Sequence, residues 1–346
     1  MKNAVGRDIP DFLLQNGREV YQGKNYMDGK YLQKASPRTR RYEKPQESKL
    51  VDSIADALRQ LGAAIEEKDG EILCRAENLR GTTVRLPFPS VGATENVMLA
   101  ATAARGETRI EGAAREPEIE ALQDYLRQMG FSVTGAGTGS ICISGGREVS
   151  HVVCRIQPDR IAAATYACAC AAAGGDVELL DVNPAHFLTV LHFLKQAGCD
   201  IITETHRVRV RADGKLRAVG EIVTRPYPGF PTDAMPVLMA ALLRSEGRTV
   251  IRETIFENRY RQVPELRKLG GEILVEGRRA EICGVEALYG ARLQATDLRG
   301  GAAMVIAGLA AEGETRILDE GHIERGYEGL DRKLRALGAD IRLTGD

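Results

Sequence analysis

The chain has 346 residues, which is long for one domain and suits two. Hydrophobic residues make up 43% and charged residues 27%, as expected of a globular protein that buries a core. The formal net charge of −1 provides no overall basic field for nucleic acid or a membrane surface, and no apolar run is long enough for a transmembrane helix.

The amino terminus and the cysteines bear on the cellular compartment. The start, MKNAVGRDIP, lacks the apolar stretch of a signal peptide. The seven cysteines are scattered, mostly within apolar runs, and none forms a C-x-x-C pair. We therefore expect buried free thiols in a reducing cytoplasm, with no bound metal and no cofactor.

The first 50 residues differ in character from the rest of the chain. Residues 21–49 are rich in charge, Gly, Pro and Tyr and have no apolar periodicity, so we interpret them as a loop. Their Arg-Thr-Arg-Arg cluster at 38–41 is either a solvated surface run or a loop that contacts an anion.

A pattern of helix end, glycine and apolar strand recurs five times from residue 57 onward. Each copy has leucine on one helix face and a basic residue in the last turn, which is typical of a helix that ends at a glycine C-cap. The glycines are spaced by 68, 68, 72 and 68 residues. They are Gly62, Gly130, Gly198, Gly270 and Gly338. Partner strands are expected at 71–76, 140–145, 207–212 and 280–285.

An Ala-rich helix recurs between these copies and is followed each time by a β-rich run. These helices end at Gly106, Gly174, Gly247 and Gly313. One unit therefore contains helix, strand, helix, strand and strand. Helices that are nearly apolar on every side are buried, so the units should pack together as layered α/β domains.

Each Ala-rich helix is preceded by a polar start with a candidate N-cap. The candidates are Ser90, Asp159, Thr232 or Asp233, and Thr296 or Asp297. Arg160 and Arg299 fall in first turns, where a cation opposes the helix dipole. An anion shared between the arginine and free backbone amides would explain this placement, whereas a well-capped core helix is the alternative reading. At PSVGATEN, Gly92 would also let a ligand approach the backbone.

Three further arginines share one position in the repeat, between the β-rich run and the next helix. They are Arg115, Arg259 and Arg325. Surface salt bridges would account for each of them alone. Their recurrence indicates an anionic ligand held between domains.

At these motifs the sequence closely resembles the UDP-N-acetylglucosamine 1-carboxyvinyltransferase family. The motifs are SVGATEN, AAREPEI, PDRI, PGFPTD, IFENRY, ATDLRGGAA and HIERGYE, in this order and spacing. The resemblance covers about residues 52–346, with a weaker patch at IPDFLL. The transferase that makes 5-enolpyruvylshikimate 3-phosphate shares the fold but not this set of motifs.

The resemblance implies an inside-out α/β barrel of repeated units, in two domains with the active site in the cleft between them. Residues 158–346 would form one complete domain of three units. Residues 1–157 would form an incomplete domain, because the family's opening unit is missing and residues 1–50 are divergent.

The family's reaction moves the enolpyruvyl group of phosphoenolpyruvate to the 3-hydroxyl of UDP-N-acetylglucosamine and releases phosphate, in peptidoglycan precursor synthesis. By resemblance Asp233 would take the hydroxyl proton. The resemblance also implies a set of substrate contacts. Ser90, Val91, Gly92 and Arg18 would contact the nucleotide, and Ile255 would contact the sugar through its backbone. Arg160 would lie close to the cleft, and Asp297 and Arg299 would line it. Arg299 and Arg325 would hold the phosphate and carboxylate of phosphoenolpyruvate.

One departure from the family leaves the activity open. The family's Gly-rich loop carries a cysteine, or an aspartate in some members, that acts as the acid and protonates the enol. The loop is expected at residues 36–52, and that stretch contains no cysteine and no Gly pair. Glu43 lies near that place, and Lys49 and Asp52 resemble the residues that close the loop. The chain is therefore either an active transferase or an impaired homologue that at most binds a nucleotide sugar. A relative of the shikimate pathway is a third, weaker alternative.

Overall fold

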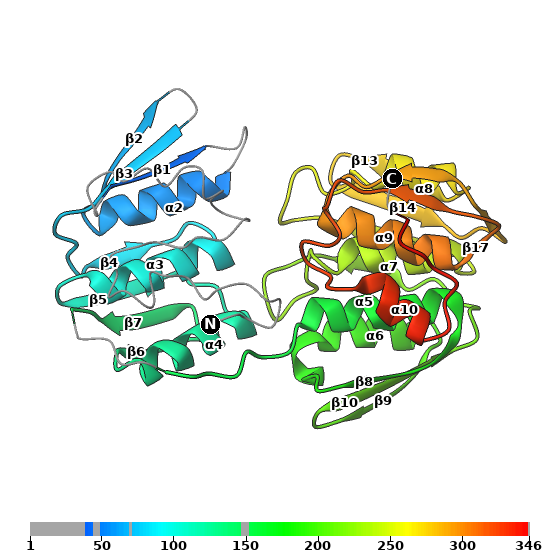
Figure 1. The fold of residues 1–346 in the computed structure, drawn as a ribbon, viewed down its shortest axis with the longest axis horizontal. Coiled ribbons are helices and arrows are strands. Elements are labelled where there is room, and N and C mark those ends of the chain that lie inside the picture. The colour runs from blue at the N-terminus through cyan, green and yellow to red at the C-terminus, as the bar shows by residue number, and fades with distance from the viewer. Residues whose placement is uncertain (1–38, 44–48, 69–70, 147–151, 345–346) are drawn as a thin grey trace. The chain divides into compact units, whose positions relative to one another are not determined.

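The computed structural model describes residues 39–43, 49–68, 71–146 and 152–344. Contacts between Cα atoms divide the chain into two compact units, Met1–Gln157 and Pro158–Asp346. We call them the N-terminal unit and the C-terminal unit (Figure 1). Arg18 and most of residues 21–49 lie outside the described residues.

The N-terminal unit contains two sheets with their helices. The first sheet has the strand order β1-β3-β2 and the second the order β4-β5-β7-β6. The strands are β1 (Thr39–Glu43), β2 (Ala64–Lys68), β3 (Glu71–Arg75), β4 (Thr83–Arg85), β5 (Glu107–Glu111), β6 (Ser132–Thr134) and β7 (Ser140–Ser144). The helices are α2 (Lys49–Gln60), α3 (Val91–Ala103) and α4 (Pro117–Gln128). Helix α3 packs against both α2 and α4.

The loop interpretation of residues 21–49 is wrong at one place. Thr39–Glu43 forms β1, which runs antiparallel to β3 with Arg40 opposite Cys74. The stretch contains Thr and Tyr, which favour strands, and the edge of β3 supplies hydrogen-bond partners for its backbone. The loop region 36–52 also ends inside α2, whose first turn contains both Lys49 and Asp52.

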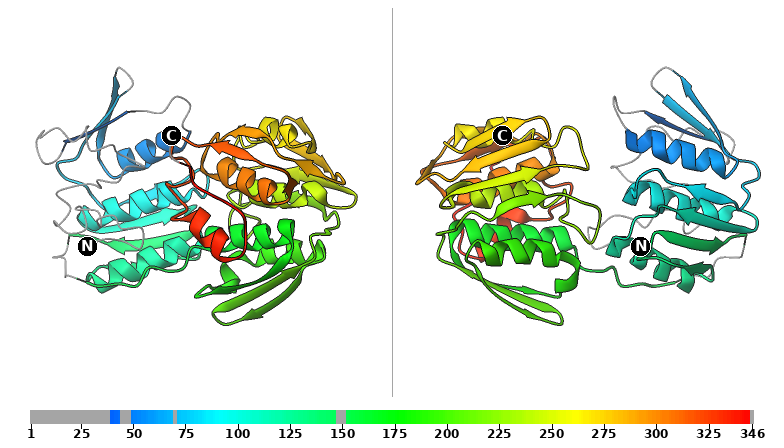
Figure 2. Two further views of the ribbon diagram at one scale, coloured as in Figure 1. Left: turned by 45° about the vertical axis from the view of Figure 1, so that its right-hand side comes forward. Right: turned by 180° about the vertical axis from the view of Figure 1, so that it is seen from behind.

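In the C-terminal unit three Ala-rich helices form the interior. They are α5 (Arg160–Ala173), α7 (Met235–Ala241) and α9 (Leu298–Leu309). Each of the three packs against the other two, and every residue of α7 is buried. Figures 1 and 2 show them side by side within the unit. Alanine and glycine allow this close approach, because small side chains bring helix axes together.

Sheets and outer helices surround these three helices. The sheet orders are β8-β10-β9 and β11-β12-β14-β13, and β15-β17 and β16-β18 form two-stranded pairs. The strands are β8 (Gly175–Leu180), β9 (Asp200–Glu204), β10 (Arg207–Ala212), β11 (Gly220–Val223), β12 (Arg248–Arg252), β13 (Glu272–Glu276), β14 (Arg279–Cys283), β15 (Leu288–Tyr289), β16 (Arg292–Gln294), β17 (Ala311–Glu312) and β18 (Arg316–Leu318). The outer helices are α6 (Leu188–Gln196), α8 (Val263–Lys268) and α10 (Leu330–Ala336), and the short 3-10 turns η2 (Pro184–Phe187) and η3 (Leu242–Arg244) adjoin α6 and α7.

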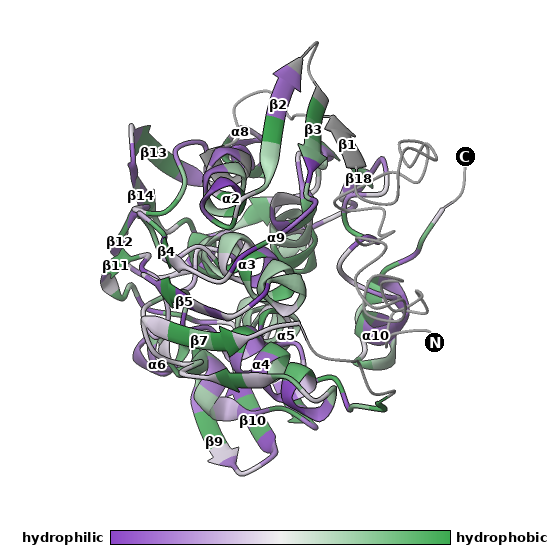
Figure 3. Ribbon diagram, turned by 90° about the vertical axis from the view of Figure 1, so that its left-hand side faces the viewer, coloured by the Kyte–Doolittle hydropathy of each residue, from purple (hydrophilic) through white to green (hydrophobic). Residues whose placement is uncertain are grey.

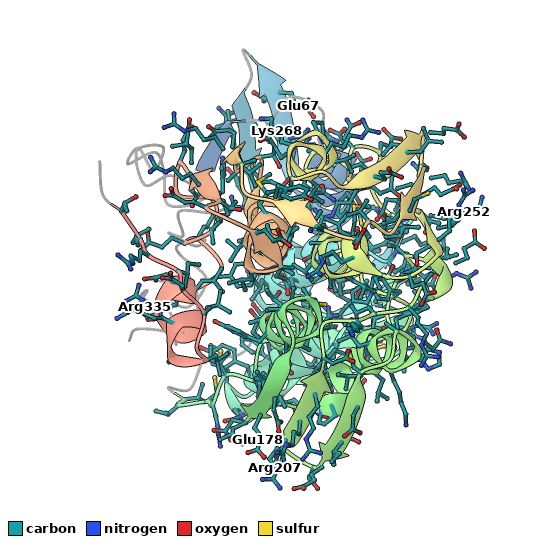
Figure 4. The ribbon with its side chains drawn as sticks, turned by 90° about the vertical axis from the view of Figure 1, so that its right-hand side faces the viewer. Glu67, Glu178, Arg207, Arg252, Lys268 and Arg335 are labelled. Atoms are coloured by element: carbon teal, nitrogen blue, oxygen red, sulfur yellow. The ribbon has the colours of Figure 1, made fainter. Side chains whose placement is uncertain are left out.

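Helices inside and sheets outside give the inside-out arrangement that the family resemblance implies. Buried and exposed residues alternate along β12, so one face of its sheet covers the interior and the other meets solvent. The outward faces carry ion pairs such as Arg207–Glu178 and Arg252–Glu221, at 3.7 and 2.8 Å (Figure 4). Exposed pairs of this kind contribute little to stability.

The hydropathy of the helices agrees with their positions. Helix α9 is mainly hydrophobic, whereas α4 mixes hydrophilic and hydrophobic residues, as Figure 3 shows. Among the described residues, none of the helices combines the length and the apolar character that crossing a membrane requires.

The five glycines of the repeat have φ values between 95° and 112°, which confirms that each ends its helix in a conformation that other residues rarely adopt. The four partner strands are confirmed as β3, β7, β10 and β14. The strand expected after Gly338 is wrong, because residues 339–344 are irregular. In the other units that strand pairs with a following hairpin strand, and no described segment pairs with these residues.

Three of the four polar helix starts, those of α3, α7 and α9, also have a strand before them that the repeat pattern did not reveal. Strand β4 pairs in parallel with β5, β11 with β12, and β16 with β18. In each case the chain leaves one strand, passes through an Ala-rich helix and returns beside that strand. This crossover brings the loop before each helix to the carboxyl end of a parallel strand, where α/β proteins place their sites.

Candidate active site

The starts of α5 and α9 are capped by aspartate, as expected. Two amides in the first turn of α5 donate to Asp159 Oδ1 at 2.8 and 2.9 Å, and two in α9 donate to Asp297 Oδ1, both at 2.9 Å. These amides are therefore engaged by their own caps. The idea that they share a bound anion with Arg160 and Arg299 is thus wrong for these amides, because the cap carboxylates already provide negative charge.

The cap expected at α7 is also wrong. The residue at the N-cap position is Ala234, and no side chain caps the helix. Thr232 Oγ1 instead donates to Glu253 Oε2 at 2.8 Å. The carboxylate of Asp233 is held by arginines from two other segments.

Asp233 lies between two guanidinium groups. Arg259 Nη2 donates to its Oδ1 at 2.6 Å, and Arg299 Nη2 donates to its Oδ2 at 3.2 Å. Both arginine side chains are only 16% exposed, whereas that of Asp233 is 40% exposed. The carboxylate is thus the part of this cluster that solvent, or a substrate, reaches most easily.

Charge controls the protonation of this cluster. Burial raises the pKa of Asp233, but the charges of Arg299, Arg259 and Arg160 outweigh it and hold the pKa below its usual value. Burial alone would lower the pKa of Arg299, yet Asp233 and Tyr327 raise it. Asp233 is therefore an ionised carboxylate at neutral pH, as a proton acceptor must be.

A buried glutamate organises the loop that follows β12. Glu253 is 1% exposed, and its Oε1 accepts from the amides of Ile255 and Phe256 at 2.7 and 2.9 Å. Its Oε2 accepts from Thr232, the residue before Asp233. Glu253 thus fixes Ile255 and Asp233 relative to each other. Sequence reasoning missed it, although it stands two residues before Ile255.

The other arginines expected in the site take different positions. The guanidinium carbon of Arg160 lies 5.8 Å from the ring centre of Tyr227. Arg325 is exposed, in the turn region before α10. Arg259, which sequence reasoning treated only as one member of the repeat, is a direct partner of Asp233.

The start of α3 in the N-terminal unit differs from those of α5 and α9. Ser90 caps it as expected, and its Oγ accepts from the amide of Ala93 at 3.2 Å. A serine cap is uncharged. The amides of Val91 and Gly92, at the first two helical positions, have no partner within the part of the chain that the structure describes. This start retains free donors.

Three carboxylates lie near one another in the N-terminal unit. Burial raises the pKa of Glu95 from 4.5 to about 7, and the charges of Glu118 and Glu116 add to the effect. Glu95 stands in the second turn of α3, within the SVGATEN motif.

This carboxylate should make the stability of the N-terminal unit depend on pH. The folded state holds the proton of Glu95 more tightly than the unfolded state, so the free energy of unfolding should fall as the pH rises from about 4.5 to about 7. Since Glu95 is only half-buried, we expect a loss on the order of 1–2 kcal/mol rather than the full value of the shift. Denaturant unfolding at pH 5 and pH 7.5 should show a flatter profile for Glu95→Gln, and an unchanged slope would contradict the assignment.

None of the cysteines is a hydrogen-bond or ion-pair partner of Asp233, Arg259 or Arg299 among the described residues. All seven are free; Cys168, Cys170 and Cys199 are buried and the other four are half-buried. Burial raises the pKa of Cys199 to about 12, so its thiol is not a nucleophile at neutral pH. No group of metal-binding side chains occurs within the described parts of the chain.

Comparison with known proteins agrees with this architecture. Residues 48–334 match the family model for EPSP synthase (3-phosphoshikimate 1-carboxyvinyltransferase). UDP-N-acetylglucosamine 1-carboxyvinyltransferase 2 of Caldanaerobacter subterraneus is 46% identical over 291 residues, which cover 84% of this chain and 70% of the relative. The chain belongs to the carboxyvinyltransferase family. UDP-N-acetylglucosamine 1-carboxyvinyltransferase of Myxococcus xanthus is also 46% identical, over a stretch that covers 84% of this chain and 69% of that protein.

Solved carboxyvinyltransferase structures share the fold. The enolpyruvyl transferase NikO from Streptomyces tendae has a TM-score of 0.76 and 26% identity, covering 88% of this chain and 74% of that chain. EPSP synthase from Acinetobacter baumannii has a TM-score of 0.65 and 22% identity, covering 85% of this chain and 72% of that chain, so it supports the fold alone. The α/β fold class expected from the family's motifs is thereby confirmed.

Proposed function

We propose that the chain transfers the enolpyruvyl group of phosphoenolpyruvate to the 3-hydroxyl of UDP-N-acetylglucosamine and releases phosphate. The observation that carries the proposal is the ionised Asp233 carboxylate between Arg259 and Arg299. A carboxylate that accepts a hydroxyl proton, beside cations that hold a phosphate and a carboxylate, is what this addition and elimination require.

In the proposed reaction the methylene carbon of phosphoenolpyruvate gains a proton and the sugar oxygen bonds to the adjacent carbon. Asp233 takes the hydroxyl proton as that bond forms. The methyl carbon formed by that protonation then loses a proton, and the bond between the adjacent carbon and the phosphate oxygen breaks, so that the double bond is restored and phosphate leaves. When the bound anion shares Arg299, the arginine's hold on Asp233 weakens, so the carboxylate becomes more basic as the substrate arrives.

The remaining site residues are proposed from the family's motifs. Ser90, Val91 and Gly92 would contact the nucleotide, and the free amides at the start of α3 support this role because helix N-termini bind phosphates. Ile255 would contact the sugar through its backbone. Arg18 would also contact the nucleotide.

Four residues would surround the anionic part of the site. Asp297 and Arg299 would line the cleft with Arg160 close to it, and Arg299 with Arg325 would hold phosphoenolpyruvate. The exposure of Arg325 supports its role, as does the fact that it forms no hydrogen bond or ion pair with another described residue. The proposed setting is peptidoglycan precursor synthesis, and thus cell wall biogenesis, in a bacterial cytoplasm.

A second candidate is a homologue that binds the nucleotide sugar without turnover. The observation that favours it is the absence of a cysteine from residues 36–52, where β1 lies. Loss of a general acid typically lowers a rate by roughly 10²–10⁴-fold.

Phosphate release separates the two candidates. The full chain, mixed with UDP-N-acetylglucosamine and phosphoenolpyruvate, should release phosphate only when both substrates are present. No release at micromolar protein, together with binding of the sugar nucleotide in calorimetry, would overturn the transferase in favour of the second candidate. Absence of both would overturn both.

A further inference from the structure

A tyrosine outside the expected site contacts the central arginine. Tyr327 is 4% exposed and stands in the turn region before α10. Arg299 Nη1 donates to its hydroxyl at 3.1 Å, and the guanidinium carbon lies 5.6 Å from the centre of its ring. The ring and the hydroxyl thus both position the same cation.

The hydroxyl is linked in turn to helix α5. Thr165 Oγ1 lies 3.0 Å from the Tyr327 hydroxyl and 2.8 Å from the backbone oxygen of Ile161. Thr165 has one hydroxyl hydrogen, and the Ile161 carbonyl can only accept, so that hydrogen is donated to Ile161. Tyr327 must therefore donate to Thr165, and its own oxygen accepts from Arg299.

These hydrogen bonds have one direction, from Arg299 through Tyr327 and Thr165 to the backbone of α5. A reversed arrangement would take the Thr165 hydroxyl away from the Ile161 carbonyl, which would keep only its helix amide, or would place two hydrogens between two oxygens. The network joins the first turns of α5 and α9, and Asp233 holds the other end of the guanidinium at Nη2. Two corners of the group are thus fixed by different segments.

The fixed guanidinium retains unused donors. An arginine has five N–H groups, and only Tyr327 and Asp233 accept from Arg299 among the residues that the structure describes. A cation that is 16% exposed and carries spare donors favours an anion with several oxygens. We propose that Tyr327 and Thr165 are positioning residues that hold Arg299 for the phosphate of the substrate. The role of phosphate as the ligand rests on the proposed function.

The test is calorimetric titration of the full chain with inorganic phosphate. Tyr327→Phe keeps the ring and removes only the oxygen, and should weaken phosphate binding by about 10-fold, since one hydrogen bond to a charged group is lost. Thr165→Val should have a smaller effect, and the double variant should be no worse than Tyr327→Phe, because both changes break the same network.

Tyr166→Phe is the matched control, because Tyr166 is a tyrosine on α5, and no hydrogen bond or cation–ring contact joins it to Arg299 among the described residues. It should leave phosphate affinity unchanged, and all four variants should keep the thermal midpoint of the wild type within a few degrees. Unchanged phosphate affinity in a folded Tyr327→Phe would overturn the proposal, as would a wild-type chain that binds no phosphate. Phosphate binding that depends on Tyr327 in a chain without turnover would support the positioning role while overturning the transferase.

Discussion

Replacing Asp233 by asparagine should lower the rate of phosphate release by roughly 10²–10⁴-fold, the usual contribution of a general base. Asparagine has nearly the same shape but cannot accept the hydroxyl proton as a carboxylate does. It also removes the negative charge between Arg259 and Arg299, so two cations of low exposure lose their shared partner. The measurement is steady-state release of phosphate with both substrates saturating.

The control for this variant is binding. Affinity for phosphoenolpyruvate should be retained or improved in Asp233→Asn, because the arginines no longer pair with a carboxylate. If Asp233→Asn kept the turnover rate of the wild type, Asp233 would not be the proton acceptor.

Replacing Glu253 by alanine should lower the free energy of unfolding of the C-terminal unit by about 3 kcal/mol. The carboxylate is buried and accepts three hydrogen bonds, from the amides of Ile255 and Phe256 and the hydroxyl of Thr232. Each donor left without a partner away from water costs about 1–3 kcal/mol, and partial access to water reduces the sum. Denaturant unfolding of the full chain followed by circular dichroism measures the change.

Glu221→Ala is the matched control on a neighbouring strand. Glu221 pairs with Arg252 at 2.8 Å on an exposed face, with its side chain 48% exposed, so its loss should cost at most about 1 kcal/mol. Equal effects of the two substitutions would mean that the loop does not depend on Glu253.

Local signals in the sequence account for most of the fold. Glycine after a leucine-rich helix end has few structural explanations, which is why the repeat could be located from Gly62 to Gly338. The Ala-rich helices could be placed in the interior because they have no polar face. Strands β4 and β16 were not predicted, because each has only three residues. Each also pairs in parallel with a strand that lies beyond a helix in the sequence, so no local pattern marks it.

The geometry of the site could not be predicted in the same way, because the residues that contact one another there lie far apart in the sequence. Asp233 precedes a helix, as an N-cap does, and only the fold brings it to Arg259 and Arg299, which lie 26 and 66 residues further along the chain. Tyr327 lies in the HIERGYE motif, yet its contact with Thr165 spans 162 residues. The Asp caps at 159 and 297 were predictable, whereas the engagement of the amides by those caps required the geometry.

A crystal structure of the full chain with UDP-N-acetylglucosamine tests most directly whether Asp233 is the proton acceptor. The sugar's 3-hydroxyl oxygen should lie within hydrogen-bond distance of the Asp233 carboxylate, with the backbone of Ile255 beside the sugar. A sugar bound with that hydroxyl directed away from Asp233, while the carboxylate remains closed on both arginines, would contradict the account.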